Sequence, residues 1–291
     1  SKRPLYFLIV ACLSNVVLDL VFVLVFKMGI AGVAIASILA QAISAVMVVM
    51  SLSAESMEYR FRFRQMRFEG DILSRTIRIG LPAGFQSIMY SLSNMLIQAS
   101  VNRFGTDTVA SWVVLGKVDG INWMILGALG IASMTFVGQN YGAGRLDRIQ
   151  KSLKLSLLIG VCISIVFGGA LLLFGWPLFG LFTSDDTVLA MSMQLLWYFA
   201  PFYWLFVPIE IISGALRGMG DTLIPTIITA TGICVFRVAW IYTVVPLHNS
   251  MFTVSLSYPI SWVLTAIAFA IYYMIARKKL IANAPKPRTA E

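Results

Sequence analysis

Residues 4–26 read PLYFLIVACLSNVVLDLVFVLVF, and this stretch decides the fold because it is an apolar run that carries Asn15 and Asp19 inside it. As a helix it is about 34 Å long, enough to cross the roughly 30 Å hydrocarbon core of a bilayer. A carboxylate there costs about 2.5–3.5 kcal/mol on insertion scales, so Asp19 is expected to face protein or a water-filled cavity. Asn15 lies four residues earlier on the same helical face. The pair predicts a site for a proton or a small cation; the alternative is a hydrogen bond that only joins two spans.

The composition predicts an all-α polytopic membrane protein. Hydrophobic residues make up 59% of the 291 residues and charged residues 12%, whereas a soluble domain has roughly 25% charged residues. Three cysteines, Cys12, Cys162 and Cys234, lie in apolar runs without the spacing of a disulfide framework or a zinc site, and neither is expected. The chain begins with Ser1 rather than methionine, which indicates a fragment of a longer protein.

Eight membrane spans are predicted from the apolar runs, over residues 4–26, 29–51, 77–101, 109–137, 153–174, 188–212, 223–245 and 252–275. An even number of spans puts both termini on one side of the membrane. Most of the 22 Lys and Arg residues fall on that side, so the positive-inside rule predicts cytoplasmic termini in a plasma or inner membrane. Because the net charge of +9 follows the membrane in this way, no nucleic-acid partner is expected.

A long polar segment, residues 51–75, separates the first two spans from the other six. Within it Tyr59–Arg64 alternates aromatic and basic residues, a pattern that can stack on single-stranded nucleic acid. Between two membrane spans the same pattern favours contact with the lipid interface and anionic headgroups. The predicted organisation is the end of one lobe over 1–51, a cytoplasmic linker over 52–75, a six-helix lobe over 76–276 and a cytoplasmic tail over 277–291.

A faint internal repeat supports this division. Residues 18–22 resemble 236–240, and residues 42–44 resemble 259–261. Since transporters are commonly built from repeated helical bundles, the match predicts a six-helix unit, of which the chain holds the last third of one copy and a complete second copy. In this alignment Arg237 takes the position of Asp19.

Four further charged residues are predicted inside spans. Glu210 follows Pro201 and Pro208, and proline in a membrane helix frees backbone carbonyls beside many transport sites. Lys117 and Asp119 are two residues apart, so they should point in different directions. Arg237 is expected to pair with an acid on a neighbouring helix, Glu210 or Asp119. An intramembrane enzyme would need a cluster of catalytic groups, and the lone histidine is His248 in a short outer loop, so no enzymatic activity is expected.

Four motifs, taken in order, resemble the multidrug and toxic-compound extrusion (MATE) family of secondary transporters. Asn15–Asp19 resembles the family's fifth helix, Gly80-Leu-Pro82 its seventh, and the glycine-rich stretches 138–145 and 214–221 its segments after the eighth and tenth helices. By generic turn chemistry both glycine-rich stretches are expected to be tight turns between helices. The resemblance implies a twelve-helix protein of two lobes, of which this chain holds helices five to twelve.

The resemblance also implies a cation site. In the family's amino-terminal lobe an acid of the first helix joins an Asn and Asp of the fifth and a hydroxyl of the sixth, and the matching residues are Asn15, Asp19 and Ser37. Some members use two more acids in the second lobe, where this chain has Tyr90 and Phe206. The second site therefore differs from that of those family members, although Glu210 lies one helical turn after Phe206. The only metal expected is a sodium ion at Asp19. No cofactor is expected.

The function that follows is efflux of small organic molecules, lipophilic cations above all, in exchange for H⁺ or Na⁺. Protonation or ion binding at Asp19 would favour one arrangement of the two lobes. The lipid bilayer and the substrates are the expected partners, with no obligate protein partner. One alternative is a flippase for lipid-linked oligosaccharides, which would need a cationic cavity, and only Lys117 and Arg237 are available for it. Another is a truncated remnant that does not transport.

Overall fold

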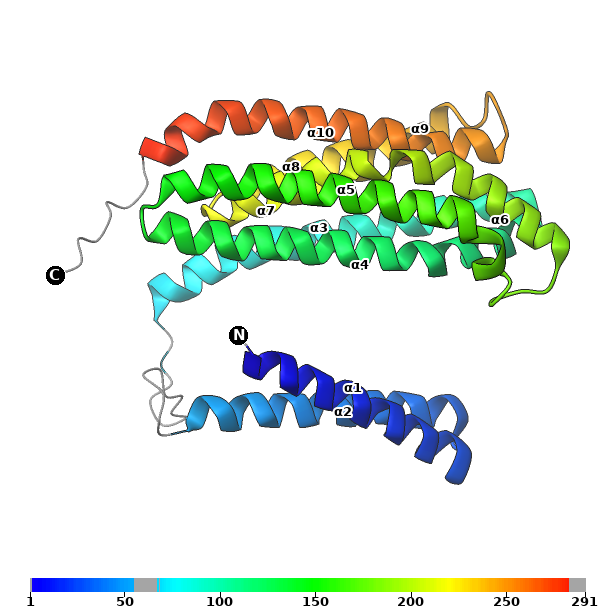
Figure 1. Ribbon diagram of the computed structural model, residues 1–291, viewed down its shortest axis with the longest axis horizontal. Coiled ribbons are helices and arrows are strands. Elements are labelled where there is room, and N and C mark those ends of the chain that lie inside the picture. Colours follow the sequence, from blue (N-terminus) through cyan, green and yellow to red (C-terminus); the bar gives the residue numbers. More distant parts are fainter. Residues whose placement is uncertain (1, 55–66, 68, 283–291) are drawn as a thin grey trace. The chain divides into compact units, whose positions relative to one another are not determined.

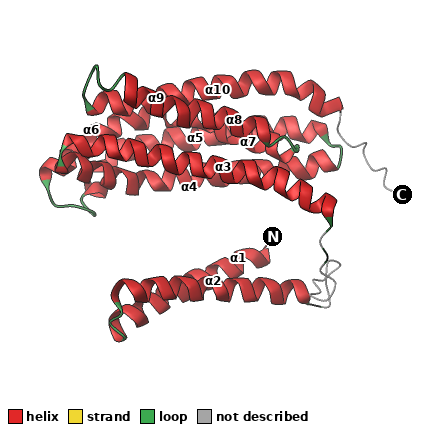
Figure 2. Ribbon diagram, turned by 180° about the vertical axis from the view of Figure 1, so that it is seen from behind, coloured by secondary structure: helices red, strands yellow, loops and turns green. Residues whose placement is uncertain are grey.

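The computed structural model describes residues 2–54, 67 and 69–282, and these residues form helices without any β-strand. Contacts divide the chain into two units, Ser1–Leu73 and Ser74–Glu291. The Tyr59–Arg64 motif and residues 283–291 of the predicted tail lie outside the described residues. The helices of the two units are drawn in Figures 1 and 2.

The first unit is a helical hairpin. Helix α1 (Lys2–Leu20) continues into a π-helical stretch, Val21–Val25, and α2 (Gly29–Ser53) returns beside it. Small residues of α2 at four-residue spacing, Gly32, Ala36 and Ala40, are buried. A Cβ added at Gly32 would lie 2.9 Å from Cβ of Phe22, so the glycine permits the close approach of the two helices.

The second unit is a helical bundle (Figure 1). Within it α4 and α7 pack against each other more extensively than any other two elements. Helix α4 also packs on α5 and α6, and α10 packs on α7. The helices of this unit are α3 (Gly70–Val101), α4 (Thr106–Gly142), α5 (Leu146–Phe179), α6 (Asp186–Phe199), α7 (Val207–Gly218), α8 (Leu223–Thr229), α9 (Phe236–Thr243) and α10 (Met251–Ala282).

Glycines bring α4 and α7 together. A Cβ added at Gly214 of α7 would overlap the carbonyl oxygen of Gly130 in α4, and one at Gly218 would overlap that of Met134. The buried Ser133 hydroxyl donates a hydrogen bond to the Ile211 carbonyl, 3.2 Å away, across the same contact. The expectation that both glycine-rich stretches are turns is therefore wrong for most of their residues. Gly138, Gly214 and Gly218 lie in close contacts between helices, and the left-handed backbone of a turn is found at Gly144 and Gly220.

Two of the predicted spans in the second unit contain breaks in the regular helix. The sixth comprises α6, a 3₁₀ segment η4 (Ala200–Phe206) and α7. Pro201 lies at the start of η4, and Pro208 lies at the start of α7. The seventh comprises α8, a π-helical segment η5 (Ala230–Val235) and α9. Both breaks lie next to residues of the cavity described below, as expected where backbone irregularity shapes a site inside a membrane.

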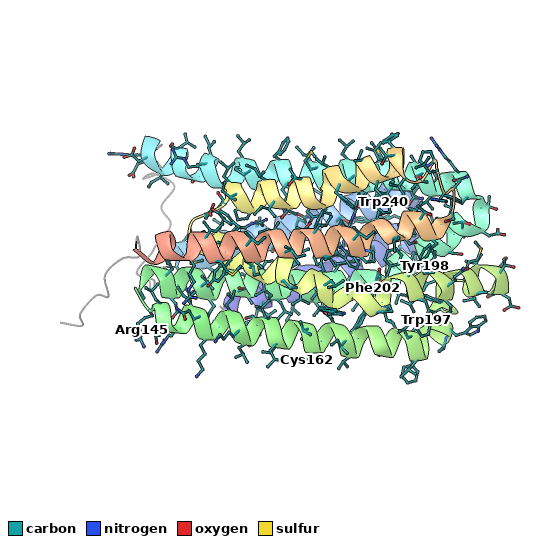
Figure 3. All side chains as sticks on the ribbon, turned by 90° about the horizontal axis from the view of Figure 1, so that it is seen from above. Arg145, Cys162, Trp197, Tyr198, Phe202 and Trp240 are labelled. Atoms are coloured by element: carbon teal, nitrogen blue, oxygen red, sulfur yellow. The ribbon has the colours of Figure 1, made fainter. Side chains whose placement is uncertain are left out.

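Seven helical segments of the described chain are long and apolar enough to cross a membrane, and they match seven of the eight predicted spans. The remaining predicted span, 77–101, falls on α3, whose 32 residues are long enough but less apolar. Two of its polar residues, Asn94 and Gln98, line the cavity described below. The outer surface of the bundle is apolar, as lipid requires: Cys162 and Trp197 are both exposed on it (Figure 3).

Candidate functional site

A cavity of about 400 Å³ lies within the second unit. This volume is in the range of small-molecule sites. Residues of α3, α4, α9, α10 and the end of the α6–η4 segment line it: Tyr90, Asn94, Ile97, Gln98, Trp112, Leu115, Gly116, Asp119, Trp123, Phe199, Phe206, Arg237, Tyr258 and Trp262.

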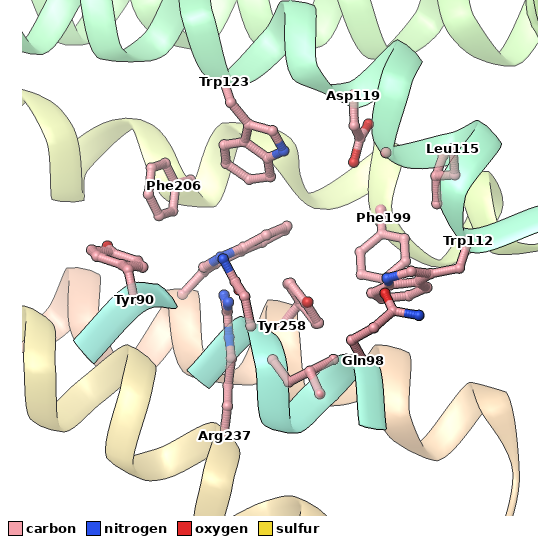
Figure 4. A pocket seen from close by; sticks show the side chains of 14 residues that line it. Tyr90, Gln98, Trp112, Leu115, Asp119, Trp123, Phe199, Phe206, Arg237 and Tyr258 are labelled. Atoms are coloured by element: carbon pink, nitrogen blue, oxygen red, sulfur yellow. The ribbon is translucent and has the colours of Figure 1, made fainter. Parts of the chain in front are cut away.

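Half of the residues that line the cavity are aromatic (Figure 4). Trp262 is fully buried, and the centroid of its ring lies 5.7 Å from that of Trp123 and 6.0 Å from that of Tyr258. Trp123 in turn packs edge-on against Phe206 at 5.0 Å. Such interlocked edge-to-face contacts hold each ring in place, so the wall is rigid and presents ring faces and edges to a bound molecule.

Asp119 is the acidic residue of the cavity. It lies on α4, is 8% exposed, and its Oδ1 accepts a hydrogen bond from the hydroxyl of Tyr203 in η4. The bond partly satisfies a carboxyl group that is removed from water. Sequence reasoning selected Asp119 but missed Tyr203, because nothing in the sequence indicates which helix faces α4 at this level.

Arg237 is the basic residue of the cavity, and its surroundings differ from the expected ones. It is 5% exposed, and in the described part of the chain neither Glu210 nor Asp119 forms an ion pair with it. Instead its Nε donates to Oγ of Ser261 at 3.0 Å, and its Cζ lies 3.9 Å from the centroid of the Tyr258 ring. The predicted acid partner is thus wrong: a hydroxyl and a ring face, both from α10, surround the guanidinium.

The other candidates of this unit are placed as follows. Tyr90 and Phe206, at the positions where some family members have acids, both line the cavity. Lys117 is exposed and lies 5.3 Å from the centroid of the Phe182 ring, on a different side of α4 from Asp119 as their two-residue offset requires. Glu210 does not line the cavity, and its carboxylate lies against Gly130.

The candidate cation residues of the first unit are divided between two grooves. Asn15 and Ser37 lie together, with Nδ2 of Asn15 donating to Oγ of Ser37 at 3.5 Å, and both line one groove. Asp19 lines a second groove with apolar neighbours, among them Val16 and Val23. Its Oδ1 is buried and has no hydrogen-bond partner among the described residues. The hairpin therefore pairs Asn15 with Ser37 and leaves one carboxylate oxygen of Asp19 available to a ligand.

Several cavity residues were missed, although the sequence carries a signal for them. Asn94 and Gln98 on α3, and Tyr258 and Trp262 on α10, recur at four-residue spacing and so share one helical face. Polar or amphipathic side chains at this spacing inside an apolar span indicate a face turned away from lipid. The signal becomes specific only when the two faces are seen to line the same cavity.

A multi-pass helical bundle with an aromatic, charged cavity inside its membrane-spanning part defines the class: an all-α membrane protein of the transporter type. A family model described as MatE matches residues 82–243, more than half of the chain, and the chain therefore belongs to the MatE family of transporters.

Two curated relatives and one solved structure illustrate the relationship. "Probable multidrug resistance protein YoeA" of Bacillus subtilis is 27% identical over 296 residues, covering 96% of this chain and 62% of the relative. An "FAD transporter" of Shewanella oneidensis is 26% identical over 200 residues, covering 65% of this chain and 43% of the relative. The solved structure is that of a MOP superfamily transporter from Pyrococcus furiosus, described as having reversed polarity of the binding pocket. It matches with a TM-score of 0.86 at 18% identity, covering 94% of this chain and 62% of that one. The chain thus spans about three fifths of the length of the first of these relatives.

Proposed function

We propose that the protein of which this chain is a part exports small organic compounds across the cell membrane in exchange for H⁺ or Na⁺. The observation that carries this proposal is the cavity of the second unit, where an acid and a base are held among aromatic rings inside a membrane-spanning bundle. Aromatic walls suit flat lipophilic molecules, and a carboxylate with ring faces beside it suits an organic cation. The name of one curated relative, a probable multidrug resistance protein, supports the same direction of transport.

The coupling ion is proposed to bind at Asp19. One oxygen of this residue is buried without a protein partner, a costly arrangement that a proton or a sodium ion would relieve. Asn15 lies one helical turn before Asp19, but it is hydrogen-bonded to Ser37 and lines the neighbouring groove, so the proposal rests on Asp19. Binding of the ion would remove a buried charge and shift the balance between two lobe arrangements. In this proposal both ends of the chain are cytoplasmic and the membrane is the plasma or inner membrane.

The alternative of a lipid-linked oligosaccharide flippase receives less support. A site for a pyrophosphate-bearing lipid would be expected to hold several cations, and Lys117 lies outside the cavity. Arg237 is then the one basic side chain among the described residues that line it. A single guanidinium offers one donor fork, whereas a pyrophosphate presents two phosphate groups.

The test is transport by the complete protein reconstituted into proteoliposomes. A fluorescent aromatic cation is supplied on one side, and either a pH gradient or a sodium gradient is imposed across the membrane. The proposal expects substrate to move against its own gradient when one of the two ion gradients is present, and to move no further than equilibrium when neither is. Uphill movement with no ion gradient, or no movement under either, would contradict it.

A further inference from the structure

The guanidinium of Arg237 is a buried cation with most of its hydrogen-bonding capacity unused. A guanidinium carries five N–H donors, and within the described chain one hydrogen bond is formed, from Nε to Ser261. The remaining donors belong to Nη1 and Nη2, on the side chain that lines the cavity. Tyr258 packs against the face of the group, with its ring centroid 3.9 Å from Cζ, and fixes the plane in which those donors lie.

No acid of this chain compensates the charge in the described residues. Asp119 lines the same cavity, but its Oδ1 accepts from Tyr203 and it forms no ion pair with Arg237. Glu210, the other candidate, lies outside the cavity against Gly130. A buried charge without a partner is strongly unfavourable, so the arrangement is suited to a partner that arrives from outside.

The ring of Trp262 carries a second unpaired donor. Its Nε1 is buried and has no hydrogen-bond partner among the described residues, and the centroid of the ring lies 6.0 Å from Cζ of Arg237. The fork of a guanidinium matches the two oxygens of a carboxylate or the oxygens of a phosphate. An indole N–H can add a further bond to the same group, and the surrounding rings would hold an aromatic system attached to it.

We infer that Arg237 and Trp262 form an anion-binding subsite that receives a carboxylate or a phosphate monoester carried by an aromatic substrate. The inference rests on the proposed function, and it extends the substrate class from lipophilic cations to aromatic anions and zwitterions. In a zwitterion, the basic group would be attracted to Asp119 and the acidic group to Arg237, two charges of opposite sign in one cavity. The ligand needs both an aromatic ring and an acidic group, because the aromatic walls bind the ring and the guanidinium of Arg237 binds the acidic group.

The test is a binding titration of the purified complete protein with ligands that share one ring system. Quenching of tryptophan fluorescence would be followed for naphthalene-2-carboxylate, for the neutral naphthalene-2-carboxamide, and for 2-naphthyl phosphate. Acetate and inorganic phosphate, which lack the ring, complete the set. We expect the carboxylate or the phosphate to bind at least tenfold more tightly than the carboxamide, and the two ringless anions to bind more weakly than either. If the unmodified protein binds the carboxamide as tightly as the two aromatic anions, or more tightly, the inference is overturned.

Variants separate an anion site from a structural role. Arg237→Gln should abolish the preference for the anion over the carboxamide, and Arg237→Lys should keep part of it, because the charge remains while the fork is lost. Arg148→Gln, which removes an exposed arginine at the start of α5, is the matched control and should leave the preference unchanged. A role limited to packing would weaken all ligands alike and leave their ratio intact, which would overturn the inference.

Transport measurements keep this inference distinct from the proposed function. If the anion preference is present but no aromatic compound crosses the membrane, the subsite stands and the proposal of transport fails. If aromatic cations are transported with ion coupling while the anion preference is absent, transport stands and the subsite fails.

Discussion

The hydroxyl of Tyr203 donates a hydrogen bond to the buried carboxylate of Asp119, joining residues that are 84 positions apart in the sequence. Tyr203 belongs to η4, the 3₁₀ break between α6 and α7, and Asp119 belongs to α4. The bond therefore fixes the irregular part of one span against the helix that carries the acid of the cavity. An acid held in this way keeps its second oxygen for a ligand, which is the geometry expected of a residue that binds a substrate cation.

Replacement of Tyr203 by Phe should destabilise the protein, because one oxygen of Asp119 would lose its donor while the ring packing stays. In a membrane protein such a bond is worth about 0.5–2 kcal/mol. The measurement is the thermal or denaturant unfolding of the purified protein in detergent. Tyr198→Phe is the control, since its hydroxyl is paired with the exposed Gln194, and its effect should be near zero. Equal effects of the two changes would show that the Asp119 bond contributes nothing.

Gly214→Ala should destabilise the contact between α4 and α7. The added Cβ would overlap the Gly130 carbonyl oxygen, which belongs to rigid backbone, so the helices must separate. Overpacking of this kind typically costs about 1–3 kcal/mol.

Gly127→Ala is the matched control on α4, because its added Cβ meets no atom within 4 Å. It should be neutral or stabilising by up to about 1 kcal/mol, the difference in helix propensity between the two residues. Unfolding measured side by side would contradict the close-packing account if the Gly214 variant were as stable as the Gly127 variant.

Asp119→Asn should weaken the binding of an aromatic amine without weakening that of an aromatic carboxylate. The change keeps the shape of the side chain and removes its negative charge, and charge-assisted hydrogen bonds are roughly twice as strong as neutral ones. Binding of naphthalen-2-ylmethylamine would be compared with that of the naphthalene carboxylate. Asp186→Asn, at the exposed start of α6, serves as the control. A loss shared equally by both ligands would mean that Asp119 acts through the structure of the cavity.

The apolar runs of the sequence predict most of the fold. Seven of the eight predicted spans coincide with helices able to cross a membrane, and Pro201 and Pro208 mark the ends of the break in the sixth. The offset between Lys117 and Asp119 is also enough to place them on different sides of α4. These features are local: they depend on the length, polarity and periodicity of one segment.

Features that depend on a second segment could not be predicted. The expected acid partner of Arg237 is absent in the described chain, because the side chains facing it come from α10 and are Tyr258 and Ser261. The glycines of 214–218 look like a turn until α4 is seen to pack against them. Helical periodicity gives the direction in which a side chain points but not the helix that it meets there.

The coupling of transport to Asp19 is the central claim, and the most direct measurement is gradient-driven uptake by the complete protein with Asp19→Asn in proteoliposomes. The Asp186→Asn variant is measured in parallel as a control for loss of an acid elsewhere. The account predicts that Asp19→Asn still exchanges labelled for unlabelled substrate at equal concentrations but no longer accumulates it when a pH or sodium gradient is imposed. Accumulation by Asp19→Asn equal to that of the unmodified protein would contradict it.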